Sequence, residues 1–214
     1  PKQFVKLFSD KSLFQLTVER NSKICKSQLV VSNTEQYFLA MDQLEELKQS
    51  NNKYLLEPTG RNTAPAVALA CLSLSRDEIV LVTPSDHLIK NETEYEKVLK
   101  KAEELAIQNN LVTFGIKPTF AETGFGYIEA NGLDVIAFHE KPNLQNAQMY
   151  VNSGNCYWNS GMFCFKAGIF LDELKKYSPK IFESSVNAFN NASKDNLTRI
   201  KYDDMENIPA DSVD

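Results

Sequence analysis

The chain has 214 residues, of which 43% are hydrophobic and 24% are charged, a balance typical of a folded globular protein. Its net charge is −5 and no block of lysine and arginine stands out, which disfavours nucleic acid and anionic membrane surfaces as main partners. No apolar run approaches the roughly 20 residues that cross a bilayer, and no signal peptide is expected. Four cysteines without a Cys-x-x-Cys pair indicate reduced thiols in a cytoplasmic protein.

Short strand-like runs alternate with helical patterns through the first half of the chain. Apolar, β-rich stretches bounded by turn residues predict strands, and apolar residues at helical spacing predict helices. The expected order is strand 27–33, helix 34–49 with Thr34 as its N-cap, strand 53–58, an Ala-rich helix, an apolar run over 78–87, helix 95–110 and strand 111–116. Such alternation predicts βαβ units and a mainly parallel sheet covered on both faces.

After residue 116 the pattern changes, which predicts a region of mixed strand directions. Strand-like stretches follow at 123–130, 134–142 and 161–167, and the first two have no long helix between them. One helix is expected at 143–154. Because no internal repeat or clear linker is present, residues 1–214 are interpreted as one α/β domain with a mixed, mainly parallel central sheet.

The segment VTPSDH places a carboxylate just beyond an apolar strand. In open α/β sheets, ligands bind outside the carboxyl ends of the strands. Pro84 ends the strand and turns the chain, so Asp86 is expected to face the crevice. A lone carboxylate there suits Mg²⁺, which takes one or two carboxylates together with phosphate oxygens and waters. The alternative is that Asp86 caps the next helix.

The segment EPTGRNTAPAVALA (57–70) puts a polar turn against a helix of small residues. A strand delivers Glu57 to the sheet edge, and Gly60 permits either close backbone approach or a positive φ. Asn62 or Thr63 can cap the helix, whose free N–H groups would favour an anion or an electronegative base edge. The Glu57 carboxylate also suits the N1–H and N2–H₂ donors of guanine. The alternative is a capped turn before a packing helix.

Two further segments carry glycines or charges at strand ends. In TGFGYIEA, Gly124 and Gly126 indicate either close backbone approach to a ligand or a simple bulge. In FHEKP, a carboxylate at Glu140 suits sugar hydroxyls and the ammonium of Lys141 suits a phosphate. The alternative for this pair is a solvated ion pair on a sheet edge.

The segment YWNSGMF combines an amide and a hydroxyl at the mouth of an apolar strand. Asn159 and Ser160 are suited to reading the hydroxyl groups of a sugar. The alternative is an Asx-type turn that leads into a core strand.

Taken together, these segments resemble the sugar nucleotidyltransferases, and among them the bacterial mannose-1-phosphate guanylyltransferases. The matching pieces, which follow the family's order over nearly the whole chain, are PKQF-KLF, EPTGRNTAPAVALA, VTPSDHLI, FGIKPT-AETGFGYIEA, F-EKP and YWNSGMF-F. The resemblance implies a Rossmann-like nucleotidyltransferase domain that transfers GMP from GTP to mannose 1-phosphate, with Mg²⁺ as cofactor and GDP-mannose and pyrophosphate as products. It also implies a cytoplasmic protein without nucleic-acid or membrane partners, and it allows a homodimer.

The resemblance also assigns roles to individual positions. Lys2 matches a lysine that contacts the phosphates, and Asp86 matches a metal-binding aspartate, so these two are the expected catalytic residues. The nucleotide-binding positions are Glu57, Gly60, Arg61 and Asn62, with Arg61 supporting the loop. The sugar-phosphate positions are Gly126, Glu140, Lys141, Asn159 and Ser160, with Lys141 near the phosphate.

Two features of the family are expected outside the chain. A glycine-rich, arginine-containing loop that wraps the triphosphate would precede Pro1, and a second metal-binding aspartate in a Trp-x-Asp-x-Gly context would follow Asp214. The domain is therefore expected to be incomplete at both ends. Some family members also carry a mannose-6-phosphate isomerase domain, so a bifunctional parent is allowed. The alternatives are a nucleotidyltransferase for another sugar phosphate and an inactive homologue that binds nucleotide sugars.

Overall fold

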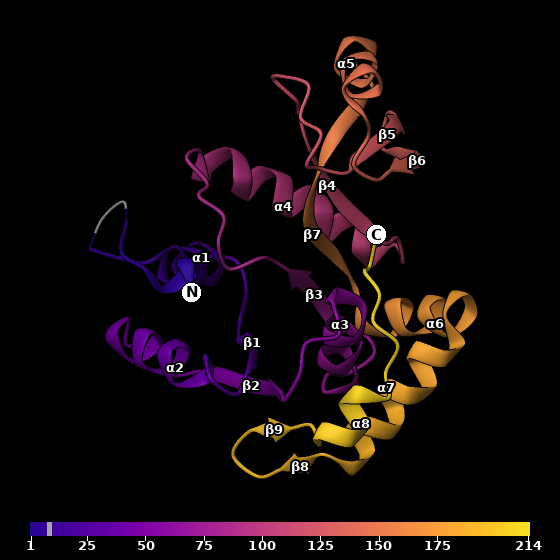
Figure 1. Cartoon of the computed structure of the whole chain (residues 1–214). Helices are drawn as coiled ribbons and strands as arrows, with labels where there is room; N and C mark the ends of the chain where they lie inside the picture. Colours follow the sequence, from indigo (N-terminus) through magenta and orange to yellow (C-terminus); the bar gives the residue numbers. More distant parts are fainter. Residues whose placement is uncertain (8–9) are drawn as a thin grey trace.

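The computed structural model describes residues 1–7 and 10–214 (Figure 1). The first elements are η1 (Lys2–Phe4), α1 (Leu13–Ser22), β1 (Gln28–Asn33), α2 (Tyr37–Glu46), β2 (Asn52–Glu57), α3 (Thr63–Leu72), β3 (Ile79–Val82), α4 (Glu92–Ile107) and β4 (Val112–Ile116). They are followed by β5 (Tyr127–Asn131), β6 (Asp134–His139), α5 (Leu144–Ser153), β7 (Cys156–Lys166), α6 (Ala167–Tyr177), α7 (Pro179–Asn191), β8 (Ser193–Lys194), β9 (Thr198–Arg199) and α8 (Tyr202–Glu206). No helix in the described part of the chain is long and apolar enough to span a membrane.

The strands form two sheets of mixed direction. One has the order β1-β2-β9-β8, in which β1, β2 and β9 are parallel. The other has the order β3-β7-β5-β6, with β4 also paired to β7, and β7 runs antiparallel to β3, β4 and β5. The expected α/β class with mixed strand directions is confirmed. Parallel pairing takes a smaller share than the strand–helix alternation predicts, because β7 opposes each of its neighbours.

The expected elements form, with three differences in where they begin. The strand expected at 161–167 begins at Cys156, so Asn159 and Ser160 lie within β7 and not at its mouth. Two helix starts also shift, for local reasons. Thr34 is not the N-cap of α2, because the turn continues to Gln36 and Asn33 Oδ1 accepts a hydrogen bond from Gln36 N at 2.8 Å. Helix α4 begins earlier than predicted, because Asn91 Oδ1 accepts from Glu94 N at 3.1 Å and caps it.

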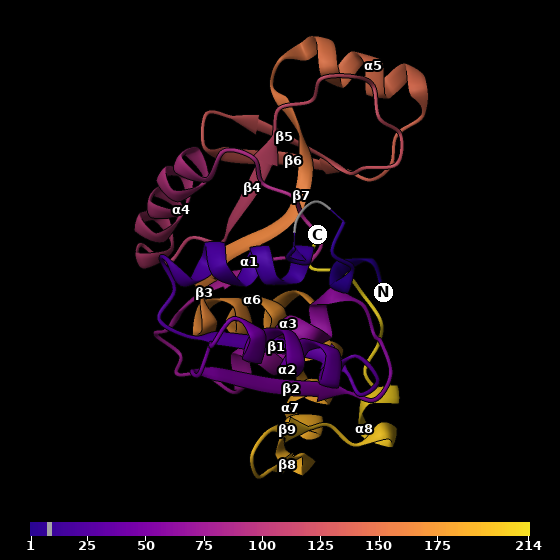
Figure 2. The same ribbon diagram turned by 90° about the vertical axis from the view of Figure 1, so that its left-hand side faces the viewer.

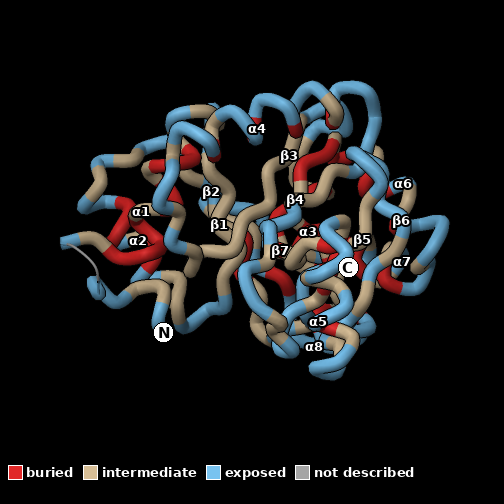
Figure 3. The backbone as a smooth tube through the Cα atoms, turned by 90° about the horizontal axis from the view of Figure 1, so that it is seen from above, coloured by how far each residue is buried: buried red, intermediate tan, exposed pale blue. Residues whose placement is uncertain are grey.

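The main core lies where α3, α6 and α7 meet the strands. Leu55, Leu69, Phe165 and Met205 are fully buried there. The small residues of α3 let α6 and α7 approach it closely, since a helix with short side chains packs at a short interaxial distance. Buried stretches accordingly gather in the interior around α3 (Figure 3).

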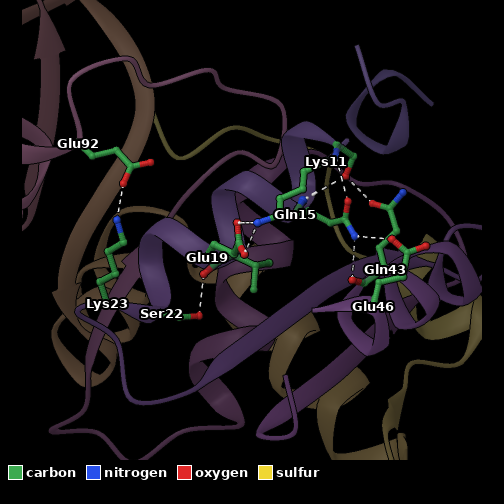
Figure 4. A network of polar contacts seen from close by, with 10 residues as sticks. Lys11, Gln15, Glu19, Ser22, Lys23, Gln43, Glu46 and Glu92 are labelled. Atoms are coloured by element: carbon green, nitrogen blue, oxygen red, sulfur yellow. Dashed lines mark hydrogen bonds and ion pairs between the residues drawn. The ribbon is translucent and has the colours of Figure 1, made fainter. Parts of the chain in front are cut away.

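Polar contacts hold α1 in place between α2 and α4. Gln15 Nε2 donates to Gln43 O at 3.1 Å and to Glu46 Oε2 at 2.8 Å, which joins α1 to α2. At the other end of α1, Lys23 forms an ion pair with Glu92 at the start of α4 (Figure 4). The helix therefore bridges α2 and the α4 side of the molecule (Figure 2).

Candidate active site

Lys2 and Asp86, expected from the sequence to act together, form an ion pair. Lys2 Nζ lies 2.7 Å from Asp86 Oδ2. Phe4 anchors η1 through an edge-on contact with Phe14, with ring centroids 5.2 Å apart. Asp86 does not cap α4, because Asn91 does so, and the capping alternative is therefore wrong.

The ion pair keeps both groups charged. Partial burial would raise the pKa of Asp86, but the hydrogen bond and charge of Lys2 outweigh it and hold that pKa below its usual value. The same hydrogen bond raises the pKa of Lys2. Burial lowers the pKa of the neighbouring His87. At neutral pH the carboxylate is thus ionised and available to a cation or to phosphate-bound metal.

The Asp86 site provides a single carboxylate for a metal ion. Among residues 1–7 and 10–214, no group of three or more His, Cys, Asp or Glu side chains is placed to hold a metal. This donor set fits a hard cation such as Mg²⁺ held largely by phosphate oxygens and water, which is the usual way proteins bind it. It does not fit a metal held by protein side chains alone.

Glu57 presents an unpaired acceptor at the end of β2. It lies opposite Asn33 in the parallel β1–β2 register. Its Oε1 atom is buried without a hydrogen-bond partner among the described residues. Burial raises the pKa of this carboxyl to about 7. A ligand that offers N–H donors would relieve the cost of leaving the oxygen unpaired.

The raised pKa of Glu57 predicts how the stability of the protein depends on pH. A folded-state pKa of about 7 against an unfolded value of 4.5 means that folding favours the protonated form, so Glu57 costs stability as pH rises through this window. We expect Glu57→Gln to raise the melting temperature relative to wild type at pH 8 and to leave it unchanged near pH 4.5. Thermal melts of both proteins across this range check it, and a constant difference at all pH values would contradict it.

The turn before α3 differs in one detail from expectation. The positive φ, 68°, belongs to Asn62 and not to Gly60. A Cβ added at Gly60 would meet nothing within 4 Å, so this position borders open space. Asn62 Oδ1 accepts from Thr63 N at 2.8 Å, which confirms the helix cap.

The first three residues of α3 offer no free N–H group for an anion. Thr63 N is bonded to Asn62, Ala64 N donates to Asp211 O at 3.0 Å, and Pro65 has no N–H. Segment 211–214 therefore occupies part of this helix terminus, and fewer N–H groups are left for an anion than the sequence suggested.

Arg61 supports the turn before α3. Its Nη2 donates to the backbone carbonyl of Glu206 at the end of α8. The side chain therefore ties the turn to α8, which is the supporting role that the resemblance assigned to it.

Gly126, Glu140 and Lys141 lie together beside the β5–β6 hairpin. A Cβ at Gly126 would be 2.6 Å from Phe138 Cζ and 3.4 Å from Glu140 Oε2, so any other residue requires the Phe138 ring to move. Lys141 Nζ lies 3.4 Å from Glu140 Oε1, and both side chains are more than half exposed. The pair therefore keeps most of its hydrogen-bonding capacity for a ligand.

Asn159 joins this group from β7, whereas Ser160 does not. Asn159 N donates to Gly126 O at 2.8 Å, and Asn159 Nδ2 donates to Asp214 Oδ1 at 2.7 Å. Ser160 is 7% exposed, and its Oγ donates to Phe114 O at 2.7 Å and accepts from Met162 N at 3.2 Å. Its hydroxyl is thus used inside the protein, contrary to the expected contact with a sugar.

The predicted residues therefore form three groups. These are the Lys2–Asp86 pair, the Glu57–Asn62 turn, and the group of Gly126, Glu140, Lys141 and Asn159. Sequence reasoning missed Gly161, whose φ of 69° and position against Pro84 link β7 to the Asp86 segment. A glycine within a strand pattern was the available signal.

A cavity of about 350 Å³ lies elsewhere, among α6, β4, β7 and residues 211–214. Its walls include Phe170, Leu174, Tyr177 and Val213, and none of the predicted site residues lines it.

Residues 1–204 match the model of the nucleotidyl transferase family. The chain belongs to this family. The nucleotidyl transferase is 43% identical over 223 residues to the xanthan biosynthesis protein XanB of Xanthomonas campestris, and 42% identical over 231 residues to mannose-1-phosphate guanylyltransferase of Escherichia coli K12. Each match covers all of this chain and 48% of the relative, so the chain spans about half the length of these proteins.

A solved structure extends the likeness to the whole fold. The crystal structure of mannose-6-phosphate isomerase from Helicobacter pylori is 43% identical and superposes with a TM-score of 0.95, covering 100% of this chain and 87% of that one. The nucleotidyl transferase thus has the expected Rossmann-like fold of its family.

Proposed function

We propose that this nucleotidyl transferase transfers GMP from GTP to mannose 1-phosphate and so forms GDP-mannose and pyrophosphate. The observation that carries the proposal is the Lys2–Asp86 ion pair just beyond β3, where an ammonium group lies beside the carboxylate that we propose as the metal ligand. The names of relatives about 40% identical, such as the E. coli guanylyltransferase, support the choice of substrates.

The transfer needs positioning and charge neutralisation, with no covalent enzyme intermediate. An oxygen of mannose 1-phosphate attacks the α-phosphorus of GTP, and the bond to the bridging oxygen of pyrophosphate breaks. Lys2 would neutralise phosphate charge from one side. Asp86 is the residue that would hold Mg²⁺, which when bound would neutralise further charge on the phosphates.

Glu57 is proposed to read the guanine base. The half-buried Glu57 carboxylate would accept from the N1–H and N2–H₂ groups of guanine, and the open surface at Gly60 lets the base approach the backbone of the turn that Asn62 shapes. An adenine ring lacks both donors at that edge, so the same carboxylate would discriminate against ATP.

Glu57→Gln is expected to weaken the binding of GTP more than the binding of mannose 1-phosphate. Loss of a charge-assisted bond at a buried site predicts a rise of about tenfold to a hundredfold in KM for GTP and little change in KM for the sugar phosphate. Steady-state kinetics with each substrate varied in turn measure this. Glu45→Gln, which neutralises an exposed carboxylate on α2, is the matched control. Equal effects on both substrates would contradict base reading by Glu57.

The sugar phosphate is proposed to bind beside the β5–β6 hairpin. Glu140 would accept hydrogen bonds from sugar hydroxyls, and Lys141 would contact the phosphate. The backbone at Gly126 and the amide of Asn159 complete this side of the site.

The direct test is pyrophosphate release by the full-length protein. GTP, ATP and UTP are each combined with mannose 1-phosphate and glucose 1-phosphate. We expect the GTP and mannose 1-phosphate pair to give the highest kcat/KM. Preference for another pair would identify a transferase of different specificity, and the absence of turnover with every pair would favour an inactive homologue.

Location and assembly are also proposals. We infer a cytoplasmic enzyme that acts on small molecules, and a homodimer is the assembly to test by sedimentation of the full-length protein. The name of the H. pylori relative supports a second proposal, that the full-length protein also has mannose-6-phosphate isomerase activity.

A further inference from the structure

Strand β7 is interrupted by a bulge at residues 159–162, called the β7 bulge below. Thr113 of β4 pairs with Phe163, whereas Gly115 pairs with Asn159, so two steps along β4 match four steps along β7. Gly161, within the extra stretch, has a φ of 69°. Bulges of this kind redirect a strand and occur frequently beside active sites.

Side chains hold the β7 bulge in shape. Ser160 Oγ donates to Phe114 O at 2.7 Å and accepts from Met162 N at 3.2 Å, so it connects the bulge to β4 and closes it on itself. Asn159 Oδ1 accepts from Gly161 N at 3.2 Å. Because Ser160 is buried, these bonds are protected from competition by water.

The β7 bulge touches both sides of the proposed site. On one side, Asn159 N donates to Gly126 O at 2.8 Å. On the other, Gly161 lies against Pro84, whose Cγ would be 3.7 Å from a Cβ at that glycine, and Pro84 stands two residues before Asp86. Figure 1 shows β7 running from the β5, β6 and α5 region to its pairing with β3.

We infer that Ser160 is a positioning residue, which fixes the β7 bulge and thereby sets Gly126 and Glu140 at the correct distance from Asp86. The inference rests on the proposed function, because it concerns how a sugar phosphate held at the hairpin meets a nucleotide held near Asp86. A misplacement of about 1 Å between reacting groups can cost about a hundredfold in rate, so a structure that sets this distance affects turnover without touching a substrate.

The first arm of the test needs no substrate. In the full-length protein without ligands, Ser160→Ala should speed hydrogen exchange at the Met162 and Asn159 amides by about tenfold or more, since Met162 N loses its acceptor. Ser153→Ala removes a comparable bond, from Ser153 Oγ to Tyr150 O at 2.8 Å on α5, and should leave these amides unchanged. Unchanged exchange in Ser160→Ala would overturn the inference.

The second arm separates positioning from direct sugar contact. Ser160→Ala should lower kcat by about tenfold to a hundredfold, because the reacting groups are misplaced. It should also raise KM for mannose 1-phosphate by about tenfold and change KM for GTP by less than about twofold, and Ser160→Thr, which keeps the hydroxyl, should restore most of the loss. Gly161→Ala removes no polar group, but an alanine is strained at a φ of 69°. This variant should therefore also raise KM for mannose 1-phosphate more than KM for GTP. Equal rises in both KM values, or an unaffected Gly161→Ala enzyme, would overturn the inference.

The two arms also separate this inference from the proposed function. If the wild-type protein forms no GDP-mannose, the proposed function is wrong. The hydrogen-exchange rates alone then test whether Ser160 fixes the β7 bulge.

Discussion

Asp86→Asn is expected to abolish metal-dependent turnover while leaving the fold intact. The amide cannot replace the negative charge that would hold a divalent cation, and Lys2 loses its partner at 2.7 Å. Removal of one electrostatic contact to a transition state typically costs about 10²–10³-fold in kcat, so a loss of on the order of a thousandfold is predicted. Pyrophosphate release by the full-length protein, with MgCl₂ varied, measures both kcat and the half-saturating metal concentration.

The fold should survive this change because the ion pair is largely exposed on the Lys2 side. Exposed pairs contribute little to stability, so the melting temperature should fall by no more than about 2–4 °C. Asp172→Asn is the matched control, since it breaks an ion pair with Arg76 of similar length, 2.6 Å, outside the site. It should keep kcat within about twofold of wild type. Retention of more than a tenth of wild-type kcat by Asp86→Asn would exclude the metal role.

Local patterns in the sequence predict much of the structure and part of the site. The cap of α3 at Asn62 and the location of Asp86 after β3 depend on neighbours a few residues away, and both are found where the pattern put them. The turn geometry was less predictable, since Asn62 rather than Gly60 takes the positive φ. Asparagine tolerates that region better than most residues, and composition alone does not say which of the two adopts it.

Contacts between distant segments were beyond these local patterns. Nothing near Ala64 indicates that its N–H is bonded to Asp211, so the helix terminus looked free for an anion. Ser160 was likewise interpreted from its neighbours Asn159 and Gly161, although its partner Phe114 lies on another strand. Hydrogen bonds between distant segments depend on the register in which strands pair. The alternation of residues along one strand does not specify which residues of another strand it pairs with.

The resemblance to a family shows only some of the contacts between distant segments that local patterns miss. It assigned Ser160 to sugar binding because of its place in a motif. In the structure, the Ser160 hydroxyl is hydrogen-bonded to Phe114 O of β4 and to Met162 N of the β7 bulge instead. It also grouped Gly126 with Glu140, and here the structure supplies the physical reason, since a side chain at Gly126 would collide with Phe138 and approach Glu140.

Gly126→Ala is therefore expected to impair the binding of the sugar phosphate and to leave the binding of GTP largely unchanged. The new methyl group would lie 2.6 Å from Phe138 Cζ, closer than real Cβ contacts come, and 3.0 Å from its Cε2, so the ring must move. Phe138 pairs with Ile128 across the hairpin and stands two residues before Glu140, so moving the ring shifts the carboxylate proposed to accept sugar hydroxyls. We expect KM for mannose 1-phosphate to rise by about tenfold to a hundredfold.

The effect on GTP should be small, because the Glu57 turn does not contact this hairpin in the proposed arrangement. Gly124→Ala is the matched control two positions away. Its Cβ would lie 3.1 Å from Glu122 Oε1, which accepts a hydrogen bond from Gly124 N at 2.7 Å, so this side chain needs to shift by only a few tenths of an ångström. Kinetics with each substrate varied, and a melting curve for each variant, distinguish a local shift from general destabilisation. If Gly126→Ala binds mannose 1-phosphate as wild type does, the β5–β6 hairpin is not where the sugar phosphate lies, and the search for that contact moves to the Lys2–Asp86 side of β7.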